Sequence, residues 1–136
     1  MELTLSQVAA RIPAAVIAVQ GDLDASNYME LIQKAQAAYA GGTRALVLDL
    51  SQTRFVSSSG LVAIHSAALI LQGLTPPDPE TGWAAIRAIG EGTGTDARAY
   101  LKLVNPQPRV DSTLEKVGFK DVLEIYPTVE DALASL

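Results

Sequence analysis

Residues 14–50 decide the fold: AAVIAVQGDLDASNYMELIQKAQAAYAGGTRALVLDL. They open with an apolar run over 14–19 and close with another over 45–50, and each run is typical of a strand covered on both faces of a sheet. Between the runs, apolar side chains recur at helical spacing and form one stripe: Tyr28, Leu31, Ile32, Ala35 and Tyr39. A buried strand, a helix and a second buried strand in this order predict a right-handed parallel crossover.

Turn and cap residues divide this stretch. Residues 21–24, GDLD, are interpreted as the turn that ends the first strand. Asn27, with Glu30 three positions later, approximates a capping box, so the helix is expected to begin there. Gly41 and Gly42 are expected to end the helix, because glycine readily takes up the backbone conformation that follows a helix C-terminus.

The rest of the chain continues the alternation of strands and helices. Further strands are expected over 3–6, 100–104 and 122–125. Further helices are expected over 58–71, over 110–117, and from Thr128 as N-cap to residue 136. Residues 51–54 are interpreted as a polar loop. These elements predict an α/β fold with a mixed sheet of four to five strands and with helices mainly on one face.

Composition bounds the domain count and excludes several kinds of chemistry. A chain of 136 residues, 49% of them hydrophobic, is long enough for one domain, here 1–136, with a packed core. The absence of cysteine excludes disulfides, thiolate metal sites and cysteine nucleophiles. His65 is the only histidine, so it is the one candidate base for a Ser-His-Asp triad, and a multi-histidine metal site lacks further histidines. We expect no cofactor.

Charge and hydropathy narrow the cellular context. The chain has a net charge of −5 and a pI near 4.7, which argues against a nucleic-acid binder, since such proteins need clustered Lys and Arg. The first residues lack the basic and then apolar segments of a signal peptide. The most apolar stretch, 61–71, is shorter than the roughly 20 residues that span a bilayer. We therefore expect a cytoplasmic protein without membrane insertion.

Three serines, Ser57, Ser58 and Ser59, precede Gly60 where an apolar helix is expected to begin. The first turn of a helix has N–H groups without intrahelical partners and a partial positive charge. A serine there can cap the helix through its hydroxyl, and a phosphoryl group added there would meet ready-made donors and bring about −1.5 to −2 charges. From the pattern alone, these serines are either regulated hydroxyls or simple caps and loop residues.

Three blocks of sequence indicate a resemblance to a known domain family. The first is GDLDAS at 21–26, and the second is LDLS at 48–51 followed by FVSSSGL at 55–61. The third is the tail, with LVNP at 103–106, VGF at 117–119 and YPTVEDA at 126–132. Together they resemble the STAS domain family, which includes bacterial anti-sigma factor antagonists. The resemblance covers about 1–72 and 99–136, and it implies a single-domain STAS-like fold.

The resemblance implies an anti-sigma factor antagonist that acts by partner switching. Such a protein binds a histidine-kinase-like, ATP-binding anti-sigma factor and thereby regulates sigma-factor-dependent transcription. The kinase phosphorylates a serine of the antagonist and ends the binding, and a serine phosphatase restores it. The family pattern Asp-Ser-Ser-Gly places the acceptor at Ser58, with Ser57 where the Asp would stand. Three alternatives remain: Ser58 is the acceptor without a neighbouring charge, Ser57 is modified instead, or the module is not switched in this way.

The resemblance also implies a partner-binding surface around these serines. Its residues are Asp22, Asp24, Ser26, Ser57, Ser58, Ser59, Gly60 and Leu61. Ser58, the acidic turn and the outer face of the following helix are expected to form one continuous surface. The acidic residues can equally serve the turn itself, because an Asp side chain bonds its own backbone two residues on. Asp49 is expected to bond loop N–H groups near the serines, and His65 is expected to be a packed residue.

Two other functional classes remain open. One is a STAS scaffold or interaction module in a stress-signalling or transport assembly, without kinase switching. The other is a small enzyme that uses Asp22, Asp24 and Asp49 as acid or base groups. No nucleophile–base pair supports the second, so we expect no enzyme.

Residues 73–98 form a proline- and glycine-rich connection, longer than the family resemblance leads us to expect. Two helical turns are possible over 83–89 within it. Trp83, Ile86 and Ile89 either dock on the domain or contact a partner, or the segment is an excursion without a role.

Overall fold

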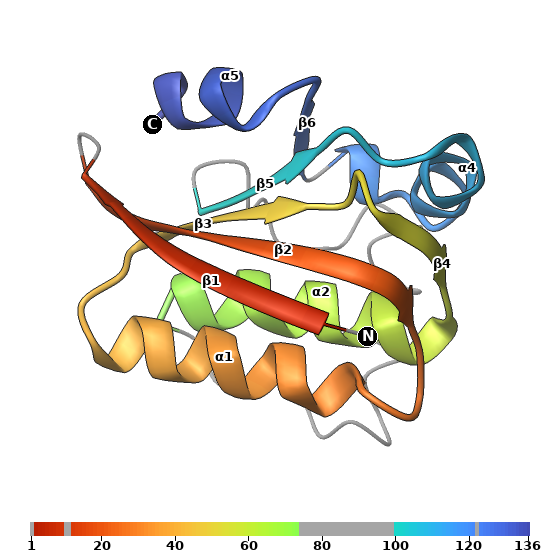
Figure 1. The fold of residues 1–136 in the computed structure, drawn as a ribbon, viewed down its shortest axis with the longest axis horizontal. Coiled ribbons are helices and arrows are strands. Elements are labelled where there is room, and N and C mark those ends of the chain that lie inside the picture. Colours follow the sequence, from red (N-terminus) through yellow and green to blue (C-terminus); the bar gives the residue numbers. More distant parts are fainter. Residues whose placement is uncertain (1, 10–11, 74–99, 122) are drawn as a thin grey trace.

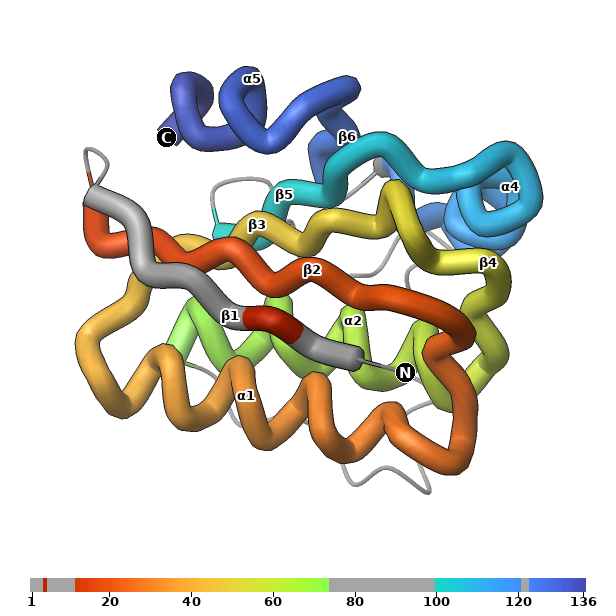
Figure 2. Tube along the Cα trace, in the orientation of Figure 1, coloured from red at the N-terminus to blue at the C-terminus, as the bar shows by residue number. Residues whose placement is uncertain are grey.

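The computed structural model describes residues 2–9, 12–73, 100–121 and 123–136 (Figures 1 and 2). The helices there are α1 (Tyr28–Ala40), α2 (Ser58–Leu71), α4 (Pro108–Lys116) and α5 (Val129–Ala134), with a 3-10 turn, η1, at Phe119–Asp121. The strands are β1 (Glu2–Ala9), β2 (Pro13–Leu23), β3 (Ala45–Asp49), β4 (Thr53–Val56), β5 (Leu101–Val104) and β6 (Glu124–Tyr126). Apart from residue 73, the segment 73–98, with Trp83, Ile86 and Ile89, lies outside the described residues.

One mixed sheet carries the fold, with the strand order β1-β2-β3-β5-β6. β2, β3, β5 and β6 run parallel, and β1 joins β2 as an antiparallel edge. Ile17 pairs with Leu48, and Leu48 pairs with Leu103, so the two apolar runs of the sequence lie side by side at the centre of the sheet. The predicted parallel crossover and the predicted mixed sheet are confirmed.

The sheet has one strand more than predicted, because β2 does not end at the predicted turn. It continues to Leu23, and its last residues pair in parallel with β4. The register shifts between Gly21 and Asp22, and Gly21 has a φ of +92°, a conformation that glycine adopts without a steric clash. Thr53 is buried in β4, where its hydroxyl donates to the Val19 carbonyl oxygen at 2.9 Å. The interpretation of 21–24 as a turn is therefore wrong for residues 21–23, and that of 51–54 as a loop is wrong for residues 53–54; Asp24 does begin a turn.

Helices cover the two faces of the sheet unequally (Figure 1). α1 and α2 pack against each other on one face, α5 lies on the opposite face, and α4 lies beside β4 at the end of the sheet. The larger core forms between the sheet and the first two helices, and a smaller one, built from Val47, Val104 and Ala132, lies under α5. The prediction of helices mainly on one face is confirmed.

α2 is buried over most of its length, because its sequence is apolar nearly all round. Ser58 is the only exposed residue of this helix, and Ser59, His65 and Leu69 are half-buried. Beyond its first turn, the outer face of α2 therefore contributes little to the continuous surface that was expected.

Candidate functional site

The serine site, defined as Ser57, Ser58 and Ser59, lies where α2 begins. Ser57 is the N-cap: its backbone is extended, and its hydroxyl oxygen accepts a hydrogen bond from the Gly60 N–H at 3.2 Å. Ser58 is the first residue of the helix and is exposed, and among the described residues its hydroxyl has no hydrogen-bond partner. The cap and the free hydroxyl are thus carried by two different serines.

The end of β2 holds this helix start in place. The Ser57 N–H donates to the Leu23 carbonyl oxygen at 2.9 Å, directly after Val56 pairs with Leu23 in the β2–β4 ladder. Gly60 lies so close to β2 that an added Cβ would be 2.6 Å from the Leu23 carbonyl oxygen and 2.8 Å from the Val56 Cγ1. Glycine is required here because no larger residue fits between the helix and the strand.

The loop between β2 and α1 is ordered by its own side chains. One carboxylate oxygen of Asp24 accepts from the Ser26 hydroxyl at 2.6 Å and from the Ser26 N–H at 2.9 Å, and these two bonds lower the pKa of Asp24. Asn27 accepts from the Asp24 N–H and donates to the Asp22 carbonyl oxygen, both at 2.9 Å. Asn27 is the N-cap residue of α1, as predicted, but its side chain makes no cap hydrogen bond. The predicted capping box is wrong, because the Asn27 amide closes the loop instead.

The sequence-predicted residues divide into two groups. Asp22, Asp24, Ser26 and the serine site gather at the same end of the molecule, because β2 leads into the acidic loop and β4 leads into α2. Gly60 is buried, and Leu61 is only 3% exposed and belongs to the core. Leu61, which the resemblance places in the partner-binding surface, packs in the core at the first turn of α2.

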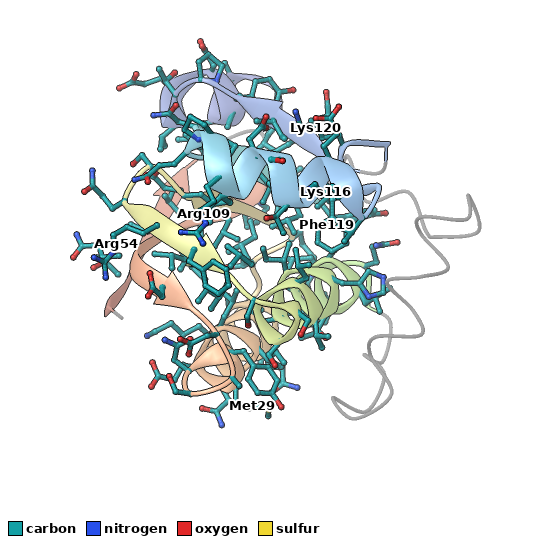
Figure 3. The ribbon with its side chains drawn as sticks, turned by 90° about the vertical axis from the view of Figure 1, so that its right-hand side faces the viewer. Met29, Arg54, Arg109, Lys116, Phe119 and Lys120 are labelled. Atoms are coloured by element: carbon teal, nitrogen blue, oxygen red, sulfur yellow. The ribbon has the colours of Figure 1, made fainter. Side chains whose placement is uncertain are left out.

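A depression that the sequence does not predict lies beside this loop. It has a volume of about 390 Å³ and is lined by Asp22, Arg54, Phe55 and Arg109, and we call it the arginine depression. Figure 3 looks onto this face, where Arg54 on β4 lies near Arg109 of α4. No local pattern signals this group, because α4 brings Arg109 to β4 only through the tertiary fold.

Two other residues have structural roles. Asp49 accepts a hydrogen bond from the Ser51 N–H at 3.0 Å. Asp49 thus bonds a loop N–H group, as predicted, but that group belongs to the β3–β4 loop and not to the serine site. His65 is half-buried and its ring stacks on Phe119 with centroids 6.5 Å apart, and burial lowers its pKa. His65 is packed, as predicted. In the described part of the chain, no group of three His, Cys, Asp or Glu residues is placed to hold a metal ion.

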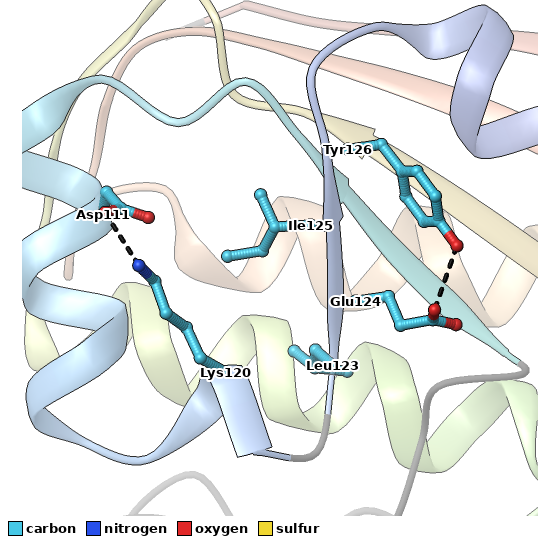
Figure 4. Close-up of a pocket in the computed structure, with 6 residues that line it drawn as sticks. All are labelled: Asp111, Lys120, Leu123, Glu124, Ile125 and Tyr126. Atoms are coloured by element: carbon cyan, nitrogen blue, oxygen red, sulfur yellow. Dashed lines mark hydrogen bonds and ion pairs between the residues drawn. The ribbon is translucent and has the colours of Figure 1, made fainter.

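A second hollow, of about 490 Å³, lies at the sheet edge formed by β6 (Figure 4). We call it the β6 hollow, and it is lined by Asp111, Lys120, Leu123, Glu124, Ile125 and Tyr126. Its polar groups bond one another: Lys120 Nζ lies 2.9 Å from Asp111 Oδ2, and the Tyr126 hydroxyl donates to Glu124 at 3.0 Å. The bond to Asp111 raises the pKa of Lys120.

None of the described helices is long and apolar enough to cross a membrane.

Comparison with solved structures identifies several similar folds. An anti-sigma factor antagonist from Mycobacterium paratuberculosis aligns with a TM-score of 0.65 at 24% identity, over 98% of this chain and 93% of that one. SpoIIAA, an anti-sigma factor antagonist, aligns in its unphosphorylated form with a TM-score of 0.64 at 18% identity, over 98% and 95% of the two chains. The phosphorylated form, from Bacillus, aligns with a TM-score of 0.58 at 18% identity, over 98% of both. At these identities the similarity establishes the fold.

Comparison with family models covers most of the chain. Residues 6–75, more than half of the sequence, match the model described as Mlab, STAS domain, and residues 93–132 match the STAS domain model. No curated protein matches the chain. The two matches lie on either side of residues 76–92, the middle of the proline- and glycine-rich segment. The first match includes the serine site, and the second includes the tail. On this basis the chain belongs to the STAS domain family.

Proposed function

We propose that this protein is a cytoplasmic anti-sigma factor antagonist that binds an anti-sigma factor serine kinase and is released when Ser58 is phosphorylated. Membership of the STAS family and the similarity in fold to anti-sigma factor antagonists support this role. One of those relatives has been solved in both phosphorylated and unphosphorylated forms. In this proposal the protein is not an enzyme, because the partner supplies the chemistry.

The observation that carries the proposal is the division of labour between Ser57 and Ser58. The Ser57 hydroxyl caps α2, whereas the Ser58 hydroxyl is exposed and has no partner among the described residues. A kinase can therefore reach Ser58 without breaking the cap. Ser57 also fills the capping role that an Asp would have at this position, although it brings no negative charge.

The position of Ser58 explains how a phosphoryl group would act as a switch. The kinase transfers the γ-phosphoryl group of ATP to the Ser58 oxygen; the bond to the β-phosphate oxygen breaks, ADP leaves, and the hydroxyl proton is released. The added charge of about −1.5 to −2 is stabilised at the positive end of α2, next to N–H groups of the first turn. The phosphoryl group also lies at the same end of the molecule as Asp22 and Asp24. A carboxylate or an apolar surface of the partner that docks on the neutral Ser58 hydroxyl is therefore excluded by the added negative charge.

Intact-mass analysis with the ATP-binding anti-sigma factor tests the acceptor. We expect the wild type and Ser57→Ala to gain one phosphoryl group, and Ser58→Ala to gain none. Undiminished phosphorylation of Ser58→Ala would contradict the proposal. In a capture experiment, wild type should retain the kinase and Ser58→Glu should lose it, although Glu imitates the charge of phosphoserine only in part. A serine phosphatase should restore binding by the phosphorylated protein.

A second candidate function is a STAS interaction module in a transport or stress-signalling assembly, without kinase switching. Ser57, which stands where the family pattern has an Asp, favours it, because it brings no charge beside Ser58. In that case the captured partner would not bind ATP, and Ser58→Glu would hold it as well as the wild type. The same capture experiment therefore separates the two functions.

A further inference from the structure

The arginine depression combines two cations with an exposed aromatic ring. Phe55 is 38% exposed on β4, and the Arg109 guanidinium lies 5.3 Å from the centre of its ring. Arg54, on the same strand, has a side chain that is 75% exposed. This group stands out because the chain as a whole carries a net charge of −5.

The two arginines keep most of their hydrogen-bond donors free. Within the described part of the chain, Arg109 is paired with no carboxylate, and a guanidinium stacked on a ring still presents its N–H edge for a planar acceptor. Arg54 reaches only one oxygen of Asp22, at 3.6 Å, and such exposed pairs are weak.

Arg44 provides an internal comparison. Its guanidinium also lies over a ring, that of Tyr39, at 4.1 Å. It differs because it donates to the carbonyl oxygens of Tyr39 and Thr43, at 2.9 and 2.8 Å. Arg44 thus uses its Nη1 donors within the chain, whereas Arg109 has the same ring stacking without an acceptor among the described residues.

The chemistry of the lining selects among possible ligands. The free guanidinium donors favour a planar anion, and carboxylates fit their fork in a bidentate way. Asp22 on the rim opposes a doubly charged phosphate more strongly than a singly charged carboxylate. The exposed ring of Phe55 favours an apolar group next to that anion.

We propose that the arginine depression binds an acidic segment of the protein partner, with a carboxylate on Arg54 and Arg109 and an apolar side chain on Phe55. The identity of that partner rests on the proposed function. Asp22 pairs with Phe55 across the β2–β4 ladder and lines the depression. The depression therefore adjoins the serine site and extends the binding surface toward α4.

A peptide titration followed by NMR tests the depression without the partner. The probe is acetyl-Leu-Asp-Leu-amide, and its control is the same peptide with Asn in place of Asp. We expect the acidic peptide to shift the side-chain Nε–H signals of Arg54 and Arg109 and the Phe55 amide signal, while Arg44 stays unchanged. Equal shifts with the Asn peptide, or shifts only at Arg44, would overturn the proposal. Stronger shifts with inorganic phosphate than with the peptide would also overturn it, since they would indicate a phosphate site.

Two charge-matched variants on α4 sharpen the result. Arg109→Gln removes a cation from the depression, and Lys116→Gln removes one from the exposed other end of the same helix. We expect Arg109→Gln to weaken binding of the acidic peptide about tenfold, the effect of losing one charge-assisted bidentate contact. Lys116→Gln should leave it within about twofold, because a distant exposed charge is screened by salt. Equal effects of the two variants would indicate nonspecific attraction and would overturn the proposal.

The outcomes separate this inference from the proposed function. If the peptide binds at the arginines but Ser58→Glu still retains the kinase, the depression stands and the proposed switch fails. If Ser58→Glu releases the kinase but the acidic peptide shifts no arginine signal, the switch stands and the depression does not bind acidic segments.

Discussion

The arginine depression and the β6 hollow both combine cations, carboxylates and an aromatic ring, yet they differ in how those groups are used. In the β6 hollow and beneath it, charged groups pair at short range: Lys120 with Asp111 at 2.9 Å, and the buried Lys102 with Glu124 at 2.6 Å. In the arginine depression, the one ion pair is 3.6 Å long and exposed. The polar groups of the β6 hollow thus bond one another, whereas the guanidinium donors of the arginine depression have few acceptors among the described residues.

The hydroxyl groups show the same contrast. The Tyr126 hydroxyl donates to Glu124, whereas the Ser58 hydroxyl has no partner among the described residues. The end of the molecule with the serine site thus keeps unused donors at its surface, while its backbone framework is tightly packed. Substitutions can test the framework and the unused groups separately.

The largest expected effect comes from Gly60, which holds the serine site against β2. Gly60→Ala should lower the free energy of unfolding by about 3 kcal/mol, because its methyl group would meet the Leu23 carbonyl oxygen and the Val56 side chain. Urea denaturation measures the loss. Gly41→Ala is the matched control, since its Cβ would be 3.5 Å from the nearest atom, and it should change stability by less than about 0.5 kcal/mol. Similar losses in both variants would contradict the close packing at Gly60.

The second-largest effect is expected at a buried ion pair, and it is compared with the effect at an exposed one. Glu124→Leu should cost about 2 kcal/mol, because it leaves the buried Lys102 ammonium, whose side chain is 4% exposed, without this partner. Arg54→Ala removes the exposed pair with Asp22 and should cost less than about 0.5 kcal/mol. Chemical denaturation of both variants gives the comparison. A loss for Arg54→Ala as large as that for Glu124→Leu would show that the arginine depression is structural.

A smaller effect separates neighbouring serines. Ser57→Ala removes the N-cap of α2 and should cost about 1 kcal/mol, whereas Ser57→Asp should retain most of the stability. Ser58→Ala should stay within about 0.5 kcal/mol of the wild type, because its hydroxyl bonds no described residue. Thermal unfolding of the three variants measures this order. If Ser58→Ala were the least stable, the Ser58 hydroxyl would have a structural role.

The smallest effect concerns the pH dependence of the acidic loop. The Ser26 bonds hold the pKa of Asp24 below its usual value of 3.8. The ionised carboxylate therefore stabilises the folded state above that pH, and this contribution is lost as the pH falls through the lower folded-state pKa. Ser26→Ala should raise the pKa of Asp24 toward 3.8 in an NMR titration. The shift should persist at high salt, since it arises from hydrogen bonds; a shift that salt abolishes would point to long-range charge instead.

Much of the fold could be predicted because its signals are local. The apolar runs at 14–19 and 45–50 are central strands, and Thr128 caps α5 by accepting from the Asp131 N–H at 3.1 Å, as predicted. The prediction failed at β4, because an exposed Arg54 and a short strand leave no alternating pattern. At Asn27 the predicted N-cap position is confirmed but the capping bond is not, because the same amide can cap a helix or close a loop.

Apolar periodicity and capping act over a few residues, so the strand–helix alternation, the burial of α2 and the position of three serines at its start follow from the amino-acid sequence alone. Three outcomes depend on the tertiary structure: Ser57 caps α2 while the Ser58 hydroxyl bonds no described residue, Leu61 is buried, and Arg109 stacks on Phe55. These outcomes depend on how β2 bends at Gly21 and where α4 meets β4. Contacts between residues far apart in the chain follow from packing of whole elements, and no local pattern encodes them.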